Sequence, residues 1–295
     1  MKTMKSLVSA ILISLIAGTA LAVDVDRTVD AAKDGHVEVS NISGAIEIEG
    51  WNQNKVEVTG TIGRDVKELI VERDGDEVLI KVKLPRGSSS ASDADLHIKV
   101  PMDSSINVGT VSADIDVSGV NGEQSLHTVS GNVTTEAKGE DVSAESVSGD
   151  VEVSGDNSDS EIEANTVSGD VTLRRVAGEV VGESVSGSVE VKEGSFDRAD
   201  LSTVNGEVNF EGELRDGGRL NIETVNGSVD VEFTGSVAAE IDIETFNGGI
   251  RNCFGPEAER TSKYTPGLEL EFTEGDGDGR VEISTMNGRV TLCKK

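Results

Sequence analysis

Apolar and polar residues alternate along most of the chain after residue 22. In residues 36–39, 55–58 and 229–233, every second residue is apolar and the residues between them are polar or charged. This period of two is typical of β-strands, because successive side chains of a strand point to opposite faces. No later segment shows the apolar stripe of a helix. The pattern therefore predicts an all-β protein.

A six-residue phrase recurs within this alternation: Thr or Ser, an apolar residue, Ser or Asn, Gly, a variable residue, and Val or Ile. It begins at Thr128, Ser146, Thr166, Ser184, Thr203, Thr224, Thr245 and Thr285, and a variant with Ala113 in place of Gly begins at Thr110. From residue 113 to residue 248, successive Gly or Ala positions are 18 to 21 residues apart.

A fixed period near twenty residues predicts a solenoid, in which each coil buries its apolar face against its neighbours. We expect a single-chain, parallel β-helix-like and right-handed solenoid with coils of 18–21 residues. About nine coils at a spacing of ~4.8 Å would form a rod of ~45 Å.

Each coil is predicted to contain two short strands joined by a tight corner at the recurring phrase. Gly at the corner is suited to a positive φ angle, and the preceding Ser or Asn can form hydrogen bonds locally or along the stack. The phrases around residues 112–186 carry Ser at this position and those around 205–287 carry Asn. We therefore expect a Ser ladder followed by an Asn ladder.

The chain divides into two sections after residue 22. Residues 23–105 form a strand-rich opening section, and residues 106–295 carry the regular coils. A loop excursion is expected at residues 254–267, where two prolines bracket a polar segment without alternation.

The apolar residue between Thr and Asn or Ser allows two interpretations. Strict alternation would point it outward, so that successive coils form an exposed apolar stripe, a candidate for self-association or partner binding. Alternatively, the corner breaks the alternation and turns the residue inward, which is the interpretation we favour. The residues concerned are Val111, Val129, Val147, Val167, Val185, Val204, Val225, Phe246 and Met286.

The two cysteines occupy equivalent places in two coils. Cys253 follows Gly248 by five residues, and Cys293 follows Gly288 by five residues. If 254–267 is an excursion, the two coils are adjacent and the Cα atoms lie within disulfide range. We predict a Cys253–Cys293 disulfide.

The first 22 residues have the features of a cleavable signal peptide. Lys2 and Lys5 precede an apolar core at 7–16, and Ala20-Leu21-Ala22 is a small-x-small cleavage site. We expect cleavage near Ala22 and a periplasmic or secreted protein. No later segment approaches the ~20 apolar residues that a membrane-spanning helix needs, so no membrane insertion is expected.

The chain carries a formal net charge of −29, and removal of the leader makes it two units more negative. Such a surface repels nucleic acid, so no nucleic-acid partner is expected. A carbohydrate-active enzyme, a lyase or hydrolase on a β-helix scaffold, is the alternative to a non-catalytic role. Aromatic residues make up only 3% of the chain, which disfavours a sugar-binding groove. We expect no catalytic residues and no cofactor.

Two short segments are candidate sites. Asp276 and Asp278 lie in a Gly-Asp repeat that could bind calcium, although calcium solenoids repeat such a motif on successive coils and this one occurs once. A calcium-dependent surface protein is therefore a further alternative. Arg260, Lys263 and Tyr264 lie in the expected excursion and form a candidate binding loop.

Several phrases together resemble a family of exported bacterial proteins. Residues 41–51, 94–101 and 268–292, with the Thr-Val-Ser/Asn-Gly coils, resemble the adhesin-like β-strand-repeat family of unknown function. The resemblance covers residues 30–293. It implies a β-solenoid at the cell envelope and carries over no catalytic residue. We therefore predict an exported, non-catalytic structural, adhesin-like or protein-binding module with an unidentified envelope or extracellular partner.

Overall fold

The computed structural model describes residues 22–85, 93–262 and 266–295, and all of their regular structure is β-strand. The predicted signal peptide lies outside the described residues except for Ala22. The strands are β1 Val23–Asp30, β2 His36–Ser40, β3 Ser43–Trp51, β4 Lys55–Ile62, β5 Glu68–Asp74, β6 Glu77–Lys83, β7 Ala94–Pro101, β8 Ser105–Gly109, β9 Ser112–Ser118, β10 Gln124–Ser130, β11 Val133–Ala137, β12 Val142–Ser148, β13 Val151–Gly155, β14 Asp159–Ser168, β15 Val171–Arg174, β16 Ala177–Ser186, β17 Val189–Asn205, β18 Val208–Asn226, β19 Val229–Phe233, β20 Ala239–Asn247, β21 Ile250–Asn252, β22 Glu259–Arg260, β23 Leu268–Glu274, β24 Gly279–Asn287 and β25 Val290–Lys294.

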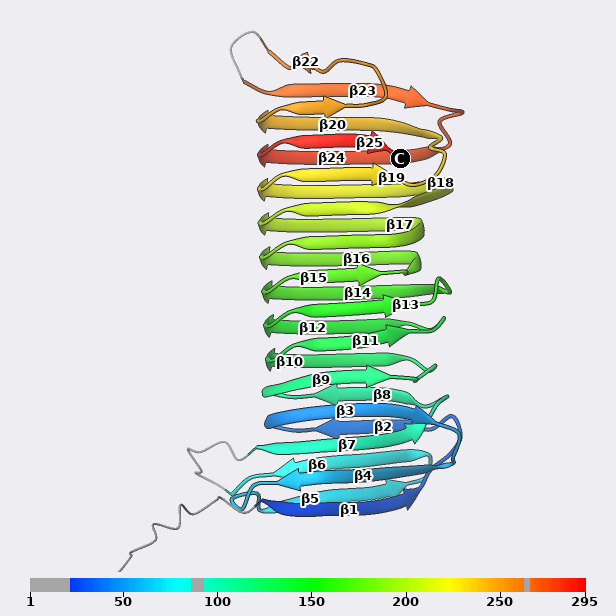
Figure 1. Cartoon of the computed structure of the whole chain (residues 1–295), viewed down its shortest axis with the longest axis vertical. Helices are drawn as coiled ribbons and strands as arrows, with labels where there is room; N and C mark the ends of the chain where they lie inside the picture. Colours follow the sequence, from blue (N-terminus) through cyan, green and yellow to red (C-terminus); the bar gives the residue numbers. More distant parts are fainter. Residues whose placement is uncertain (1–21, 86–92, 263–265) are drawn as a thin grey trace, which may run out of the picture.

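The middle of the molecule is a stack of two-strand coils, seen side-on in Figure 1. On one face β8, β10, β12, β14 and β16 pair in parallel, each with the next. On the other face β9, β11, β13, β15 and β17 do the same. The predicted all-β solenoid is confirmed.

The coils at the C-terminal end are not stacked in sequence order. Strand β24 pairs in parallel with β18 on one side and with β20 on the other. Likewise, β25 lies between β19 and β21. The last coil in sequence is therefore inserted one place inside the end, as Figure 1 shows. Strand β23 then covers β20 in the antiparallel direction.

The N-terminal end also contains an inserted coil, but here the inserted coil comes first in sequence and lies between two coils that follow it. The coil β2–β3 lies between β6–β7 and β8–β9. Strand β4 pairs antiparallel with β7, and β1 pairs antiparallel with β4. The opening section thus forms the N-terminal end of the rod. Its coil β2–β3 separates β6–β7 from β8–β9, although β8 follows β7 directly in sequence.

The core lies between the two faces and is built from ladders of Val, Ile and Leu. Phenylalanines replace them in three successive coils near the C-terminal end. Phe196 and Phe210 have ring centroids 5.4 Å apart, and Phe210 and Phe233 have centroids 5.9 Å apart. All three rings are fully buried, so they add contacts between aromatic rings to the aliphatic core.

The expectation that the corner glycines need a positive φ angle is wrong. None of them lies in the left-handed region. A Cβ atom at any of these positions would instead overlap the backbone carbonyl oxygen of the corner residue in the neighbouring coil. Gly is therefore required by the close approach of two backbones. The glycines are Gly131, Gly149, Gly169, Gly187, Gly206, Gly227, Gly248 and Gly288.

Hydrogen bonds along the stack hold the corners together. In six coils the buried Thr or Ser that opens the phrase donates to the corner carbonyl of a neighbouring coil, as from Ser146 Oγ to Gly131 O at 2.9 Å. The hydroxyls of Thr224 and Thr245 make no such bond. The predicted Asn ladder is present: Asn226 Nδ2 donates to Asn205 Oδ1 at 3.0 Å, and Asn287 Nδ2 to Asn226 Oδ1 at 3.0 Å. Asn247 Nδ2 donates to Asn287 Oδ1 at 3.4 Å.

Candidate functional site

The apolar residue in each phrase is exposed, so the interpretation that the corner turns it inward is wrong. The reason is that the strand continues through it. Ser130, the next residue after Val129, is still paired in register with Ser148 of the following coil. Thr128, just before it, is 5% exposed, while Val129 is 47% exposed. The alternation therefore persists up to the corner.

These side chains form one stripe along the rod. Their exposed fractions run from 38% at Val225 to 59% at Phe246. Apart from Val23, every exposed large hydrophobic residue in the described part of the chain belongs to this apolar stripe. It lies along the left-hand corners in Figure 1, where the arrowheads of β10, β12, β14 and β16 point. In spatial order it consists of Val111, Val129, Val147, Val167, Val185, Val204, Val225, Met286 and Phe246.

The stripe is about 40 Å long, because adjacent strands are ~4.8 Å apart. It is one side chain wide. A gathering of nearly all exposed large apolar residues on one line is typical of an interaction surface, since single scattered residues are the norm elsewhere.

Polar residues border the stripe on the corner side and form a second ladder. Asp114 Oδ1 accepts a hydrogen bond from Asn132 N at 2.8 Å, and Asn132 Oδ1 accepts one from Asp150 N at 2.9 Å. The series continues from Asp150 to Asp170 and Ser188. This ladder was not predicted from the sequence. Its signal was the residue after each corner glycine, which is Asp, Asn or Ser in these coils.

The other side of the stripe is bordered by the outward-facing residues that precede each stripe residue by two positions in sequence. At the middle of the rod, His127 Nδ1 lies 3.1 Å from Glu145 Oε2. Toward the C-terminal end the row contains Ser202, Glu223, Ser284 and Glu244 in spatial order. In the middle coils the apolar stripe therefore has carboxylates on both sides, whereas the corner-side residues at its C-terminal end are Glu207, Ser228, Arg289 and Gly249.

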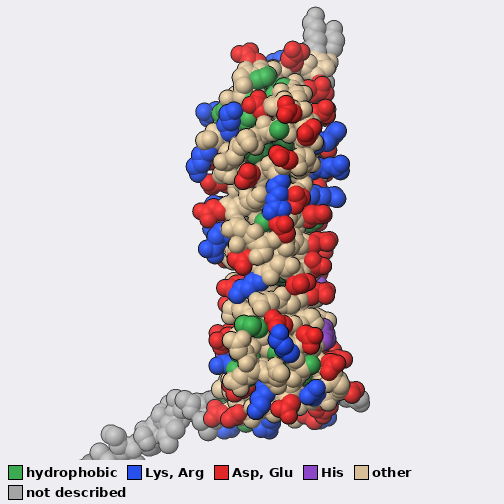
Figure 2. All heavy atoms as spheres, turned by 90° about the vertical axis from the view of Figure 1, so that its right-hand side faces the viewer, with side chains coloured by type: hydrophobic (Ala, Val, Ile, Leu, Met, Phe, Trp, Pro, Cys, Tyr) green, Lys and Arg blue, Asp and Glu red, His purple; other side chains and the backbone are tan. Residues whose placement is uncertain are grey.

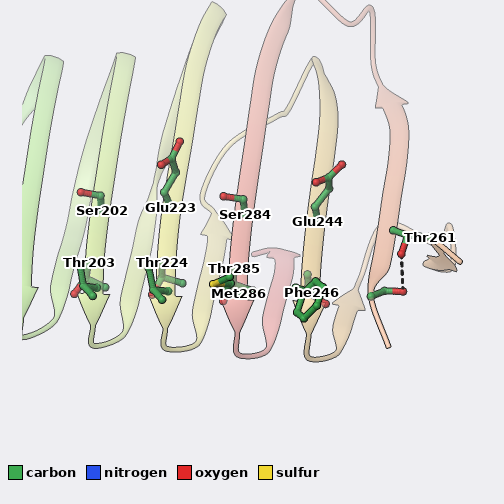
Figure 3. A pocket seen from close by; sticks show the side chains of 14 residues that line it. Ser202, Thr203, Glu223, Thr224, Glu244, Phe246, Thr261, Ser284, Thr285 and Met286 are labelled. Carbon is green, nitrogen blue, oxygen red and sulfur yellow. Dashed lines mark hydrogen bonds between the residues drawn. The ribbon is translucent and has the colours of Figure 1, made fainter. Parts of the chain in front are cut away.

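The C-terminal end of the stripe deepens into a groove of about 510 Å³. Its floor is formed by the last four stripe residues in space, Val204, Val225, Met286 and Phe246. Figure 3 shows the row with Glu223 and Glu244 standing beside this floor, and Thr261 closing the end.

The end wall of the groove belongs to the cap formed by β22 and β23. Thr261 N donates to Gly267 O at 3.2 Å, and the Thr261 hydroxyl donates to the same oxygen at 3.4 Å. A Cβ atom on Gly267 would lie 2.8 Å from Thr261 Oγ1 and 3.1 Å from Thr245 O. The wall is thus packed closely against β20.

The face turned to the viewer in Figure 2, the right-hand side of Figure 1, differs in character. It carries acidic and basic side chains over its whole length. Arg215 connects its own coil to two others by contacting Asp159 at 2.5 Å and Asp197 at 2.7 Å.

The predicted Cys253–Cys293 disulfide is confirmed, with the two Cα atoms 4.9 Å apart. It joins β25 to the end of β21. Because the Cys293 coil is inserted, the bond links the outermost complete coil to the one beneath it.

The other predicted site residues do not gather into one site. Asp276 and Asp278 are exposed in the turn between β23 and β24. In residues 22–85, 93–262 and 266–295, no three His, Cys, Asp or Glu residues are grouped as metal ligands would be. Arg260 is exposed in β22, and Lys263 and Tyr264 lie outside the described residues.

Clustered carboxylates could serve as the catalytic acids of an enzyme, but several outward-facing acids of this chain form hydrogen bonds or ion pairs within the fold. Asp150 and Asp170 belong to the corner ladder. Glu152 contacts Arg174 at 3.3 Å, and Glu190 contacts Lys192 at 2.5 Å. No helix in the described residues is long and apolar enough to cross a bilayer.

Three solved structures of similar proteins cover nearly the whole chain. A "putative lipid binding protein" from Parabacteroides distasonis is 15% identical, covers 91% of this chain and 96% of its own, and has a TM-score of 0.48. A "putative adhesin" from Bacteroides fragilis is 10% identical, with coverages of 92% and 97% and a TM-score of 0.44. A "putative adhesin" from P. distasonis is also 10% identical, with coverages of 92% and 98% and a TM-score of 0.44. Likeness at this level carries no conclusion about a ligand.

Curated protein sequences give no significant match. A family model, in contrast, matches residues 24–184 and again residues 176–293, which together span almost all of the described chain. The chain therefore belongs to the Toastrack DUF4097 family.

Proposed function

We propose that this protein is an exported, non-catalytic binding module of the adhesin-like kind, which contacts a partner at the bacterial envelope through its apolar stripe. The observation that carries the proposal is the concentration of exposed large hydrophobic residues on this single line. Folding does not require an apolar residue at these exposed positions, because Thr has a shape similar to that of Val and a similar preference for strands.

The non-catalytic part of the proposal is supported by the contacts of the acids. Asp150, Asp170, Glu152 and Glu190 make ladder bonds or ion pairs that stabilise stacked coils. A glycosidase needs a pair of carboxyl groups held about 5–10 Å apart on either side of a sugar-binding cleft. The groove that the structure offers has an apolar floor instead.

The export part is supported by two independent features. The sequence predicts a cleavable signal peptide, and the structure contains a disulfide. Disulfides persist in oxidising compartments such as the periplasm and the cell exterior. A partner there would meet the stripe on a rod that is otherwise acidic.

The test compares the capture of envelope proteins by three forms of the mature protein: the wild type, a stripe variant and a control variant. In the stripe variant, Val147→Thr, Val167→Thr and Val185→Thr replace three exposed methyl-bearing side chains without touching the core. We expect the wild-type protein to retain a specific partner from native envelope extract, with and without calcium, and the variant to lose it.

The matched control is Val181→Thr, the same exchange on β16 but outside the stripe. It should capture the partner as the wild type does, and all forms should unfold at the same temperature. Equal capture by the stripe variant would contradict the proposal. Capture that requires calcium would favour the calcium-dependent alternative.

A further inference from the structure

We infer that the groove at the C-terminal end of the stripe binds a cationic amphipathic helix of a partner protein, lying along the axis of the rod. The inference rests on the proposed function, because the groove is the end of the same stripe. It adds where the partner binds and what chemistry its binding segment has.

The first observation is that the stripe changes composition at the groove. Seven of its members are Val, and the two that lie last in space are Met286 and Phe246. These two are also the most exposed, at 54% and 59%. A long flexible side chain and an aromatic ring give more contact surface than Val, and both types are enriched in the buried centres of protein interfaces.

The second observation is the charge around this floor. Glu223 and Glu244 stand on the same side of it, and its lining in the described part of the chain contains no Lys or Arg. In that part of the chain no basic residue forms an ion pair with either carboxylate. A partner with apolar residues flanked by Lys or Arg would therefore match both the floor and its border.

The third observation is the spacing. Glu223 and Glu244 are both Cα partners of Ser284, so two strand steps, or about 9.6 Å, separate them along the rod. Residues i and i+7 of an α-helix lie about 10.5 Å apart, and the apolar seam of a helix recurs every ~5 Å. An extended peptide repeats each face at about 6.6 Å and does not match the ~4.8 Å coil spacing.

A second copy of this chain fits the groove less well. A stable interface uses roughly 20–30 residues from each partner, so contact would extend beyond the stripe to its borders. Those borders carry carboxylates, and each chain has a net charge of −29. Like charges opposite one another oppose such an assembly, whereas a cationic segment is attracted.

The test uses a fluorescein-labelled synthetic helix of about 18 residues, with Leu at i, i+3, i+4 and i+7 positions and Lys pairs seven residues apart beside them. Its binding to the mature, disulfide-bonded protein is followed by fluorescence anisotropy. Two control peptides have the same composition in scrambled order, or Glu in place of each Lys. Only the first peptide should bind, and its affinity should fall as salt is raised.

Protein variants locate the contact. Phe246→Thr with Met286→Thr should weaken binding by about tenfold or more, and Glu223→Gln with Glu244→Gln should weaken it by several-fold and reduce the salt dependence. Val181→Thr, on β16 but outside the stripe, should stay within about twofold of the wild type. The side chains of Phe246, Met286, Glu223 and Glu244 are all exposed, and unfolding curves check that every variant remains folded.

Equal binding of the scrambled peptide, or unchanged binding by the Phe246 and Met286 variant, would overturn the inference. So would failure of the peptide to bind while zwitterionic or anionic phospholipid vesicles are retained through Phe246 and Met286. If the stripe variant loses its envelope partner but no cationic helix binds the groove, the proposed function stands and this inference fails. If the stripe variant keeps its envelope partner and the cationic helix does not bind, both the proposed function and this inference are wrong.

Discussion

Asn287 donates a hydrogen bond of 3.0 Å to Asn226, although 61 residues separate the two in sequence. Asn247, which comes between them in sequence, lies beyond Asn287 in space and donates to it. The Asn ladder thus follows the spatial order of the coils. Its bonds cross the two junctions that the inserted coil creates.

Replacement of Asn226 should weaken this region. Asn226→Ala removes one donated and one accepted hydrogen bond, and we expect the free energy of unfolding to fall by about 1–2 kcal/mol. Urea denaturation measures the change. Asn209→Ala, on the same strand but outside the ladder, should change stability by no more than about 0.5 kcal/mol; an equal loss at both positions would contradict the role of the ladder.

A side chain at a corner glycine should be poorly tolerated. Gly149→Ala would place a Cβ atom against Gly131 O, a backbone atom held on both sides by the stack, and we expect a loss of about 1–3 kcal/mol. Gly109→Ala is the control, because a Cβ atom there meets nothing within 4 Å. The control should be neutral or slightly stabilising. Thermal unfolding of the two variants should separate them clearly.

Reduction of the disulfide should destabilise the C-terminal end. Cys253 and Cys293 close a loop with a sequence separation of 40, so we expect a loss of about 2–4 kcal/mol in urea on addition of a reductant. In the double variant Cys253→Ser with Cys293→Ser, stability should be lower from the start and unaffected by the reductant. A reductant effect that persists in this variant would point to another cause.

Two carboxylates should give opposite pH dependence. Glu136 accepts a hydrogen bond of 3.1 Å from Gly119 N, and this bond, with Lys138, lowers its pKa below the ordinary 4.5. Its contribution to stability is therefore present above pH 4.5 and is lost as the pH falls through the lower pKa of the folded state. Glu136→Gln should make acid unfolding less steep in this range.

Burial, with nearby Glu47 and Glu136, raises the pKa of Asp116 above the ordinary 3.8. Folding therefore favours its protonated form, and stability increases as the pH falls through the raised pKa of the folded state. Asp116→Asn should stabilise the protein at neutral pH and make the decline in acid steeper. Urea denaturation at a series of pH values measures both variants, and equal slopes in all three proteins would contradict the assignment.

The sequence predicted what is local and repeated. The alternation around Val229 and Val231 placed these residues in the core, and the equal offsets of Cys253 and Cys293 placed the disulfide. The order of the coils could not be predicted, because the phrases at Thr224, Thr245 and Thr285 are nearly interchangeable and each can stack on any other. The right-handed sense of the coil stays a prediction.

The two errors at the corner have one physical origin. The corner was expected to interrupt the strand, which would give Gly131 a positive φ angle and turn Val129 inward. Instead, backbone pairing continues to Ser130, and the tight contact between stacked backbones requires the glycine. The groove could not be predicted either, since its floor joins Val225, Met286 and Phe246 in an order that only the inserted coil creates.

Strands β24 and β25 lie between coils that precede them in sequence. The stack of coils is therefore complete only when these two strands are in place. Without residues 279–294, β18 and β20 each lose the strand with which they pair in parallel at this level of the rod. Residues 279–294 are therefore an internal layer of the rod, although they come last among its strands in sequence.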